Sequence, residues 1–296
     1  MKSGFVALMG RPNAGKSTLL NALVNAKVAI VSEKAGTTRD NIRGIYNSDD
    51  AQIVFIDTPG IGKPQHLLNA RMNKMALSEV DGVDIIYYLV DASIPFGSGD
   101  QYLLSLLENT KTPVFLLLNK IDQLNKKALF ELIMQWQLRF DFKEIIPVSA
   151  LDNDNVDTLI QVTLSYLEEG YAYFDREAIT DRSTSFQIKE YIREKILYHT
   201  QQEVPHSVAV VIDELSKNKN SYHISATIVV ERDSQKGILI GNQGKMIKRI
   251  GIAARKDMQN LLNKPVFLQL YVRVEKNWRD NPNKLYQLGY LDIDEQ

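Results

Sequence analysis

The sequence predicts an α/β domain with a doubly wound, mostly parallel sheet, followed by a smaller α+β domain. Two observations support the first domain. Apolar strands alternate with helical segments up to about residue 170, and polar motifs follow the ends of these strands. A third observation supports the second domain, because a G-x-x-G tetrapeptide lies there between two helical stretches. We expect the domains to span 1–170 and 186–296, with a linker at 171–185.

Composition restricts the classes of site that this chain can carry. Its 296 residues are enough for two domains of ordinary size, and the absence of cysteine excludes disulfides and thiolate metal sites. No apolar run reaches the length of about 18 residues that a membrane-spanning helix needs. The chain enters a predicted strand close to Met1, so we expect no signal peptide.

Charge is distributed unevenly along the chain. Residues 1–184 carry 18 Lys and Arg against 23 Asp and Glu, whereas residues 185–296 carry 17 against 13. Between Gln235 and Lys256 there are six basic residues and no acidic one. The second half is therefore expected to meet nucleic acid or another anionic surface.

The first strand and helix flank a phosphate-binding pattern. Apolar residues at 5–9 predict a strand, 17–25 has helical character, and the segment between them fits G-x-x-x-x-G-K-[ST]. Its glycines let consecutive N–H groups point at phosphates, and the helix N-terminus adds a positive dipole. Lys16 would reach the β- and γ-phosphates, and Ser17 would bind Mg²⁺. The alternative is a glycine-rich turn that only joins strand to helix. The nucleotide-binding candidates here are Gly10, Arg11, Pro12, Asn13, Ala14, Gly15, Lys16, Ser17 and Thr18.

A second motif follows a predicted hairpin. A polar loop at 32–40 precedes strands at 43–47 and 52–56, and the second strand ends in Asp57-Thr58-Pro59-Gly60. An acid at the end of a buried strand is the Walker-B position, where a carboxylate supports Mg²⁺. Gly60 lets a backbone N–H approach the γ-phosphate. The candidates here are Asp57, Thr58, Pro59, Gly60 and Ile61.

Two further motifs follow the last two strands of this domain. The predicted order is a helix at 66–80, a strand at 84–90, a helix at 101–107, a strand at 113–118, a helix at 126–140, a strand at 144–148 and a helix at 156–167. The motif residues that follow these strands are Asn119, Lys120, Ile121, Asp122, Ser149, Ala150 and Leu151.

The motif at 119–122 predicts which base is bound. The Asp122 carboxylate can accept from both N1–H and the 2-amino group of guanine, whereas adenine offers neither donor. We expect Asn119 to support the loop, the Lys120 stem to lie along the base, and the backbone at Ser149-Ala150 to donate to O6. The alternative is that Asn119 and Asp122 merely cap the next helix.

Together these segments resemble the five successive motifs of translation-factor-type GTPases. The resemblance implies GTP and GDP as ligands, Mg²⁺ as cofactor, and Lys16, Thr38, Asp57 and Gly60 as catalytic residues. In such GTPases a threonine of the first switch loop binds Mg²⁺ only in the triphosphate state. Thr38 is our choice and Thr37 the alternative, and Asp57 is expected to act on Mg²⁺ through its water ligands.

Three residues bear on how the attacking water is held. Ile61 stands where Ras-like GTPases place a glutamine, so water must be positioned by backbone groups, another residue or a cation, and we expect slow intrinsic hydrolysis. Asn13 lies where related GTPases coordinate K⁺, the alternative being a role in shaping the loop. Arg39 is expected to be solvated rather than to serve as an arginine finger.

The second domain has the element order of a prokaryotic, type II KH domain. A helix at 186–197, strands at 208–215 and 221–231, the G-x-x-G loop, a helix ending near 262 and a strand at 266–274 follow one another. In KH domains this loop clamps a nucleic-acid backbone. We expect Ile240, Ile247 and Ile250 to offer an apolar floor to unstacked bases. The alternative is a structural helical turn with solvated lysines. The RNA-binding candidates are Lys236, Ile240, Gly241, Asn242, Gln243, Gly244, Lys245, Lys248 and Arg249.

A G domain followed by such a KH domain resembles the Era family of bacterial ribosome-assembly GTPases. The resemblance implies binding to 16S ribosomal RNA near its 3′ end and a role in maturation of the small subunit. It also implies a cytoplasmic protein that associates peripherally with the inner face of the cell membrane, and we expect a monomer. The competing hypothesis is a non-enzymatic RNA-binding module whose G domain is a nucleotide-sensitive platform.

Overall fold

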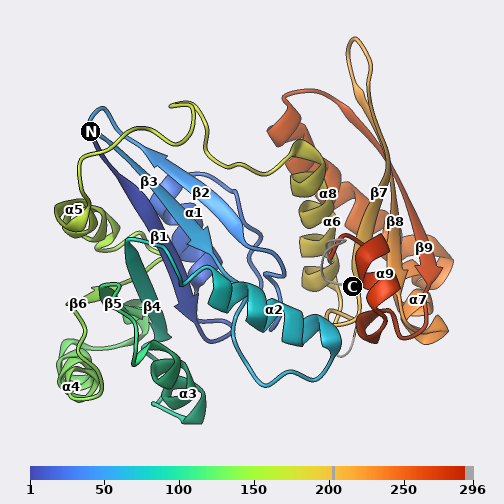
Figure 1. Ribbon diagram of the computed structural model, residues 1–296. Helices are drawn as coiled ribbons and strands as arrows, with labels where there is room; N and C mark the ends of the chain where they lie inside the picture. Colours follow the sequence, from blue (N-terminus) through green and yellow to red (C-terminus); the bar gives the residue numbers. More distant parts are fainter. Residues whose placement is uncertain (202–203, 291–296) are drawn as a thin grey trace. The chain divides into compact units, whose positions relative to one another are not determined.

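The computed structural model describes residues 1–201 and 204–290, which form two compact units (Figure 1). The first unit comprises residues 1–31, 38–64 and 71–181. The second comprises residues 32–37 and 65–70 together with the described residues from 182 onward. Two short loop segments from the first half of the sequence therefore belong to the second unit.

The first unit is built on a six-stranded sheet in the order β2-β3-β1-β4-β5-β6 (Figure 1). Its strands are β1 (Lys2–Gly10), β2 (Ile42–Asn47), β3 (Ala51–Asp57), β4 (Ile85–Asp91), β5 (Val114–Asn119) and β6 (Glu144–Val148). All neighbouring strands run parallel except β2 and β3, which are antiparallel. The predicted doubly wound, mostly parallel sheet is confirmed.

Helices cover both faces of this sheet, which explains why its inner strands are apolar without alternation. Successive side chains of a strand point to opposite faces. On β4, the Tyr87 hydroxyl is hydrogen-bonded to Thr163 of helix α5 (Val156–Tyr166), whereas Tyr88 packs on Trp136 of helix α4 (Lys126–Gln137) with ring centroids 5.9 Å apart. The helices of this unit are α1 (Lys16–Val24), α3 (Ser98–Leu107), α4 (Lys126–Gln137) and α5 (Val156–Tyr166); α2 (Leu67–Ser78) begins in the 65–70 segment.

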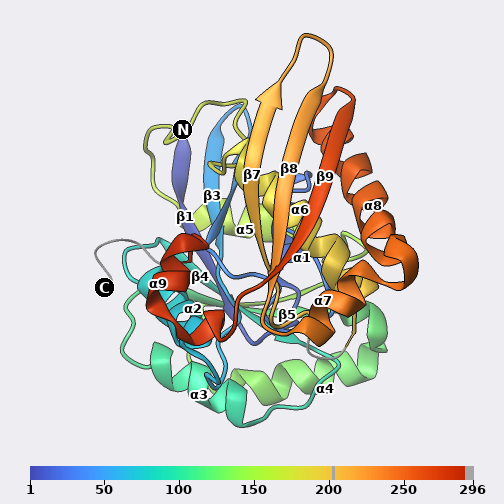
Figure 2. The same ribbon diagram turned by 90° about the vertical axis from the view of Figure 1, so that its right-hand side faces the viewer.

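The main part of the second unit packs α6 (Thr184–His199) and α8 (Lys245–Leu262) against a three-stranded sheet (Figure 2). The sheet order is β7-β8-β9, with β7 (Ala209–Lys217) antiparallel to β8 (Tyr222–Val230) and β8 parallel to β9 (Val266–Val274). The short helix α7 (Asp233–Ile240) precedes the G-x-x-G loop. This element order confirms the predicted α+β KH fold.

Two features were not predicted. After β9 the chain forms a 3₁₀ turn, η3 (Trp278–Asp280), and a short helix, α9 (Pro282–Gln287). Trp278 is fully buried and its indole N–H donates to the Ser207 carbonyl over 3.0 Å, which anchors this turn to the unit. The stretch expected to be a linker also lies along β2, where the Ile45 N–H donates to the Ile179 carbonyl over 3.0 Å.

Candidate nucleotide site and nucleic-acid interface

The phosphate loop connects β1 to α1 through a left-handed turn. Asn13 has φ of +66° and Gly15 has φ of +97°, so α1 begins directly behind a curled backbone. A Cβ on Gly15 would lie 2.1 Å from Asn119 Nδ2, so only glycine fits at this position. The structure thus places the N-terminus of α1, a site that favours anions, directly behind this loop.

Lys16 lies inside this loop. Its side chain is buried, and its ammonium donates to the carbonyls of Gly10 and Arg11, over 3.1 Å in each case. Burial lowers the pKa of Lys16 to about 8, an effect that the neighbouring Asp57 charge opposes. A desolvated ammonium held by two neutral carbonyls is well placed to bind phosphate oxygens.

Three predicted metal-site residues converge beside Lys16. The Ser17 hydroxyl donates to Asp57 Oδ2 over 2.5 Å and lies 2.8 Å from the Thr38 hydroxyl, which donates to the same Oδ2 over 3.3 Å. The Thr37 hydroxyl instead donates to the Lys34 carbonyl over 2.6 Å. The structure therefore brings Thr38, and not Thr37, to Ser17 and Asp57.

The donor set of this cluster fits Mg²⁺. Asp57 is fully buried, and its Oδ1 accepts no hydrogen bond from any residue in the described part of the chain. Burial raises the pKa of Asp57 to about 6, against the effect of Lys16 and of the hydroxyls of Ser17 and Thr38. Two hydroxyls and a carboxylate are hard oxygen donors, and Mg²⁺ takes few protein charges when phosphates supply the rest.

The segment after β3 closes on the phosphate loop. A Cβ on Gly60 would lie 2.7 Å from the Pro12 Cα, so the backbone of Gly60 meets the loop directly. The Thr58 hydroxyl donates to the Leu8 carbonyl over 2.7 Å. Ile61 is buried in the core of the first unit, so its side chain packs and does not contact water.

The expectation that Arg39 is solvated is wrong. Only 3% of its surface is exposed. A charged side chain is buried to this extent when polar groups around it compensate for lost water, which a sequence pattern does not reveal.

Asn119 links the base-side loops to the phosphate loop. Its Nδ2 donates to the Ala14 carbonyl over 2.8 Å, and its Oδ1 accepts from the Ala150 N–H over 3.0 Å. It is 2% exposed at the end of β5. The predicted supporting role of Asn119 thus corresponds to hydrogen bonds that hold three loops together, rather than to a helix cap.

The Asp122 carboxylate lies at the open side of this arrangement. It is exposed, and its Oδ1 accepts from the Ser149 hydroxyl over 2.7 Å, which orients the group. Lys120, with φ of +67°, donates to Asp91 Oδ2 over 2.5 Å, so that its stem is fixed. Ile121 is partly buried in the same turn, and Leu151 is largely exposed.

Sequence reasoning missed two acids that hold site residues. Asp91 at the end of β4 pairs with Lys120, and Asp100 near the start of α3 pairs with Arg11 over 3.0 Å. Asp100 is buried and also accepts from the Gly97 N–H over 3.0 Å. An acid at the end of a buried strand was the available signal for Asp91. No local signal identifies Asp100, which lies 89 residues from its partner.

The G-x-x-G loop of the second unit has the backbone that its glycines predict. Gly241 and Gly244 have φ of +69° and +75°, and α8 begins directly after Gly244. Asn242 and Gln243 are exposed between them. The side chains of Lys245, Lys248 and Arg249 are exposed on the first turns of α8, and Lys236 is partly exposed on α7. Cations therefore surround an uncharged loop at a helix N-terminus.

One of the three isoleucines expected to form an apolar floor for bases does not lie at the surface, so that expectation is wrong for this residue. Ile250 is fully buried in the core of the second unit, so it cannot contact a base. Ile240 and Ile247 remain partly exposed. Ile247 and Ile250 lie on one face of α8, the face that packs on α6 and β9, and the packing is complete at Ile250.

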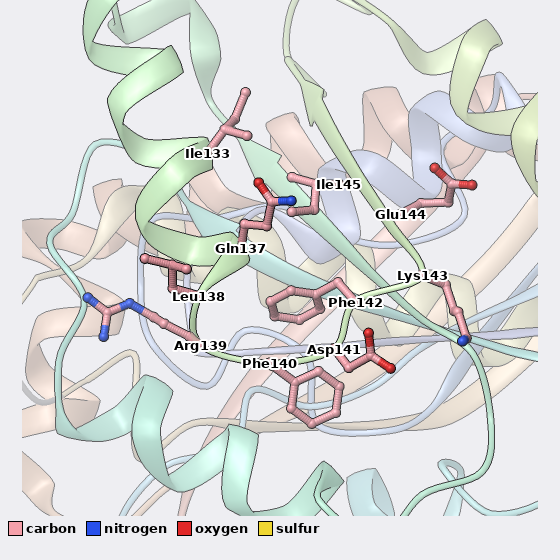
Figure 3. A pocket seen from close by; sticks show the side chains of 10 residues that line it. All are labelled: Ile133, Gln137, Leu138, Arg139, Phe140, Asp141, Phe142, Lys143, Glu144 and Ile145. Carbon is pink, nitrogen blue, oxygen red and sulfur yellow. The ribbon is translucent and has the colours of Figure 1, made fainter.

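A surface hollow at the end of α4 and the start of β6 is separate from these motifs (Figure 3). It is lined by residues of 133–145, among them Phe140 and Phe142. Figure 3 shows Arg139 and Glu144 on opposite sides of it, so its charged groups do not converge on one point. It contains none of the predicted site residues.

Comparison with known families identifies two domains in this chain. The profile of the "50S ribosome-binding GTPase" family matches residues 5–120, and that of the KH domain matches residues 203–279. The chain is 51% identical over 292 residues to the GTPase Era of Leuconostoc citreum strain KM20. The match covers 98% of this chain and 96% of that relative.

Two solved structures are similar over nearly the whole chain. One is a single-residue variant of Aquifex aeolicus Era bound to GDP.AlF4⁻, with 37% identity, a TM-score of 0.95 and coverage of 99% of this chain and 100% of that one. The other is Era in complex with MgGDPNP and nucleotides 1506–1542 of 16S ribosomal RNA, with 38% identity, a TM-score of 0.96 and the same coverage. With this identity to a GTPase Era over nearly its whole length, and with the same fold as two Era structures, the chain belongs to the Era family of GTPases.

Proposed function

We propose that this chain hydrolyses GTP to GDP and phosphate and uses this cycle to control its binding to 16S ribosomal RNA near the 3′ end, during maturation of the small ribosomal subunit. The observation that carries the proposal is the convergence of Lys16, Ser17, Thr38 and Asp57 beside one helix N-terminus. The 51% identity to a GTPase Era supports the same activity.

Each site residue has a role in this chemistry. The amides of the phosphate loop bind the α- and β-phosphates, and Lys16 binds the β- and γ-phosphates. Ser17 and Thr38 would hold Mg²⁺ through their hydroxyl oxygens, and Asp57 would support the ion through water. When bound, the ion would supply positive charge that offsets the charge developing on the β- and γ-phosphate oxygens. The Gly60 N–H meets the γ-phosphate, and because Ile61 is buried, the attacking water is oriented by backbone groups or a cation.

Phosphate release by the purified full-length chain tests the activity. With GTP and Mg²⁺ we expect slow release, and after removal of Mg²⁺ with EDTA we expect none, because the γ-phosphate charge is then no longer neutralised. Turnover of tens per second without a partner would contradict the expected slow intrinsic rate. No release at all with Mg²⁺ would favour the competing hypothesis, a nucleotide-sensitive platform without catalysis.

We also propose that Asn13 binds K⁺ and thereby supports hydrolysis. Asn13 is exposed in the phosphate loop, where its backbone is left-handed, and its amide oxygen is a ligand of the type that K⁺ accepts. Faster phosphate release in KCl than in NaCl, and loss of that difference in Asn13→Ala, is the expected result. Equal rates in both salts would leave Asn13 with a role in loop shape alone.

The identity of the RNA ligand is inferred from the KH domain and not from the GTPase domain. The family matched by residues 5–120 is described by binding to the 50S subunit, whereas the Era complex contains RNA of the small subunit. The KH match covers the G-x-x-G loop and the cations around it, which lie outside the part matched by the GTPase family. The likeness to the Era complex, which extends over the KH domain, therefore favours 16S ribosomal RNA as the ligand of this chain.

Gly241→Asp tests the RNA clamp. The new carboxylate would repel phosphates, so we expect RNA binding to weaken by ~10-fold or more while GTP binding is unchanged. A Cβ at this position would also lie 2.7 Å from the Met246 Cβ. Gly241→Ala is the matched control, because it adds the Cβ without the charge and should lose less affinity. Filter binding to a 16S 3′-end fragment measures both, and equal affinity of Gly241→Asp and wild type would remove this loop from the account.

We further propose that the protein is a cytoplasmic monomer that associates peripherally with the inner face of the cell membrane. Membership of the Era family supports this proposal. In the described part of the chain, no helix is both long and apolar enough to cross a bilayer. Flotation with anionic vesicles tests the association, and size-exclusion chromatography tests the oligomeric state; absence of vesicle binding, or a dimer, would refute the corresponding part.

A further inference from the structure

The second unit holds two loop segments that adjoin nucleotide motifs in the sequence. Residues 32–37 lead directly into Thr38, and residues 65–70 follow the Asp57–Gly60 motif and begin α2. In GTPases both regions respond to the γ-phosphate. Contacts inside the second unit that fix these segments therefore bear on the nucleotide state.

Arg193 of α6 holds the first segment. Its side chain is fully buried, and its guanidinium makes a bidentate pair with Glu190, with Nε 2.9 Å from Glu190 Oε1. The same guanidinium donates to the Thr37 carbonyl. A planar guanidinium fixed on one edge by a carboxylate has its remaining donors fixed in direction. The peptide bond before Thr38 is thereby oriented by α6.

A buried ion pair of this kind is not expected to add much to the free energy of unfolding. Burying an ion pair removes both charges from water, and apolar residues of similar volume often stabilise a protein as well or better. A buried pair that also binds a loop carbonyl is instead suited to selecting one loop conformation. In the conformation selected here, Thr38 reaches Ser17 and Asp57.

Asp280 of η3 holds the second segment. Its Oδ1 accepts from the Leu67 N–H over 3.0 Å, and its Oδ2 lies 2.8 Å from His66 Nδ1. Leu67 is the first residue of α2, so Asp280 satisfies an N–H at a helix start from outside that helix. The Leu67 N–H is also the main cause that lowers the pKa of Asp280 below its ordinary value.

The turn that carries Asp280 is itself anchored. Trp278, two residues earlier, is fully buried and bonded to Ser207, and Arg279 pairs with Glu231 over 2.5 Å. Asn281, the next residue, caps α9 by accepting from the Lys284 N–H over 3.2 Å. Because the residues on both sides of Asp280 are held in this way, its carboxylate has a fixed position at the start of α2.

We propose that Arg193 and Asp280 are positioning residues for the nucleotide site: each holds one nucleotide-sensing segment in the arrangement that favours the triphosphate over the diphosphate. The inference rests on the proposed GTPase function and deepens it by naming the residues through which the second unit senses the nucleotide. By thermodynamic reciprocity, a ligand of the second unit that changes these contacts would change the nucleotide preference by the same factor.

The ratio of GDPNP to GDP affinity in the full-length chain tests the proposal. Asp280→Ala removes one contact. Glu190→Gln/Arg193→Met removes the other and neutralises both members of the ion pair together. We expect each variant to bind GDPNP ~10-fold more weakly, within the range usual for coupling between sites, with GDP affinity changed less than about twofold. Arg193→Lys, which keeps one donor for the Thr37 carbonyl, is expected to retain part of the preference.

Control variants distinguish a positioning role of Arg193 and Asp280 from a purely structural role. Asp49→Ala and Arg176→Ala remove exposed charges of the same types and should leave the ratio unchanged. An unchanged ratio in both test variants would overturn the proposal. Equal loss of both nucleotides, with a lowered melting temperature, would also overturn it by showing a purely structural role. The assay needs neither RNA nor hydrolysis, so failure of the proposed function is detected separately, as absence of phosphate release or of RNA binding by the wild type.

Discussion

Replacing Lys16 by Ala is expected to reduce GTP hydrolysis at least ~100-fold, the scale of losing one donor to a transition-state charge. The Lys16 ammonium is buried and held by the Gly10 and Arg11 carbonyls. A unit charge about 4 Å from a phosphate oxygen contributes ~4 kcal/mol at an effective dielectric constant of about 20. No neighbouring cation of the phosphate loop, which the structure describes in full, can replace it, because Arg11 is paired with Asp100.

Single-turnover phosphate release and nucleotide titration measure this loss. Lys127→Ala is the control, since the Lys127 side chain is 88% exposed on α4 and should affect neither quantity. Hydrolysis and binding at wild-type level in Lys16→Ala would contradict the assignment of the phosphate loop.

Asp122→Asn is expected to shift base preference from guanosine toward xanthosine nucleotides. The carboxylate accepts two hydrogen bonds from guanine, and each bond to a charged group is worth ~1.5–3 kcal/mol. Loss of both predicts a decrease in GTP affinity of roughly 10²- to 10⁴-fold, because about 1.4 kcal/mol corresponds to tenfold. An amide can instead donate to the 2-oxo group of xanthine. The Ser149 hydroxyl, 2.7 Å from Asp122 Oδ1, would still orient the new side chain.

Competition of GTP and XTP for the full-length chain checks this prediction. Asp152→Asn alters an exposed acid in the neighbouring loop and serves as the control. It should keep the guanosine preference of the wild type. If Asp122→Asn also kept that preference, base reading would have to lie elsewhere, and Asn119 and Asp122 would be no more than helix-capping residues.

The parts of the site that sequence predicts are those encoded locally. The phosphate loop and the 119–122 motif combine fixed spacings with strand and helix boundaries, so their place at the carboxyl ends of strands follows from the α/β alternation. Choosing between Thr37 and Thr38 needed the structure. Adjacent residues of a loop point in different directions, and only the Thr38 hydroxyl reaches Ser17.

What the sequence did not predict depends on partners that are distant along the chain. Asp280 and Leu67 are 213 residues apart, and Arg193 and Thr37 are 156 apart. Neither Asp280 nor Arg193 lies in a motif. The errors at Arg39 and Ile250 have the same origin, because a charged or apolar residue in a loop or helix reveals its burial only once the packing is known. The short helix α9 escaped notice because six residues give too little periodicity.

The affinity of the full-length chain for an RNA with the sequence of nucleotides 1506–1542 of 16S ribosomal RNA, compared between GDPNP and GDP, tests the central claim most directly. We expect ~10-fold tighter binding with GDPNP, within the range usual for coupling between two sites. Equal affinity in the two nucleotide states would mean that the guanine site does not control the RNA site, and would contradict the account.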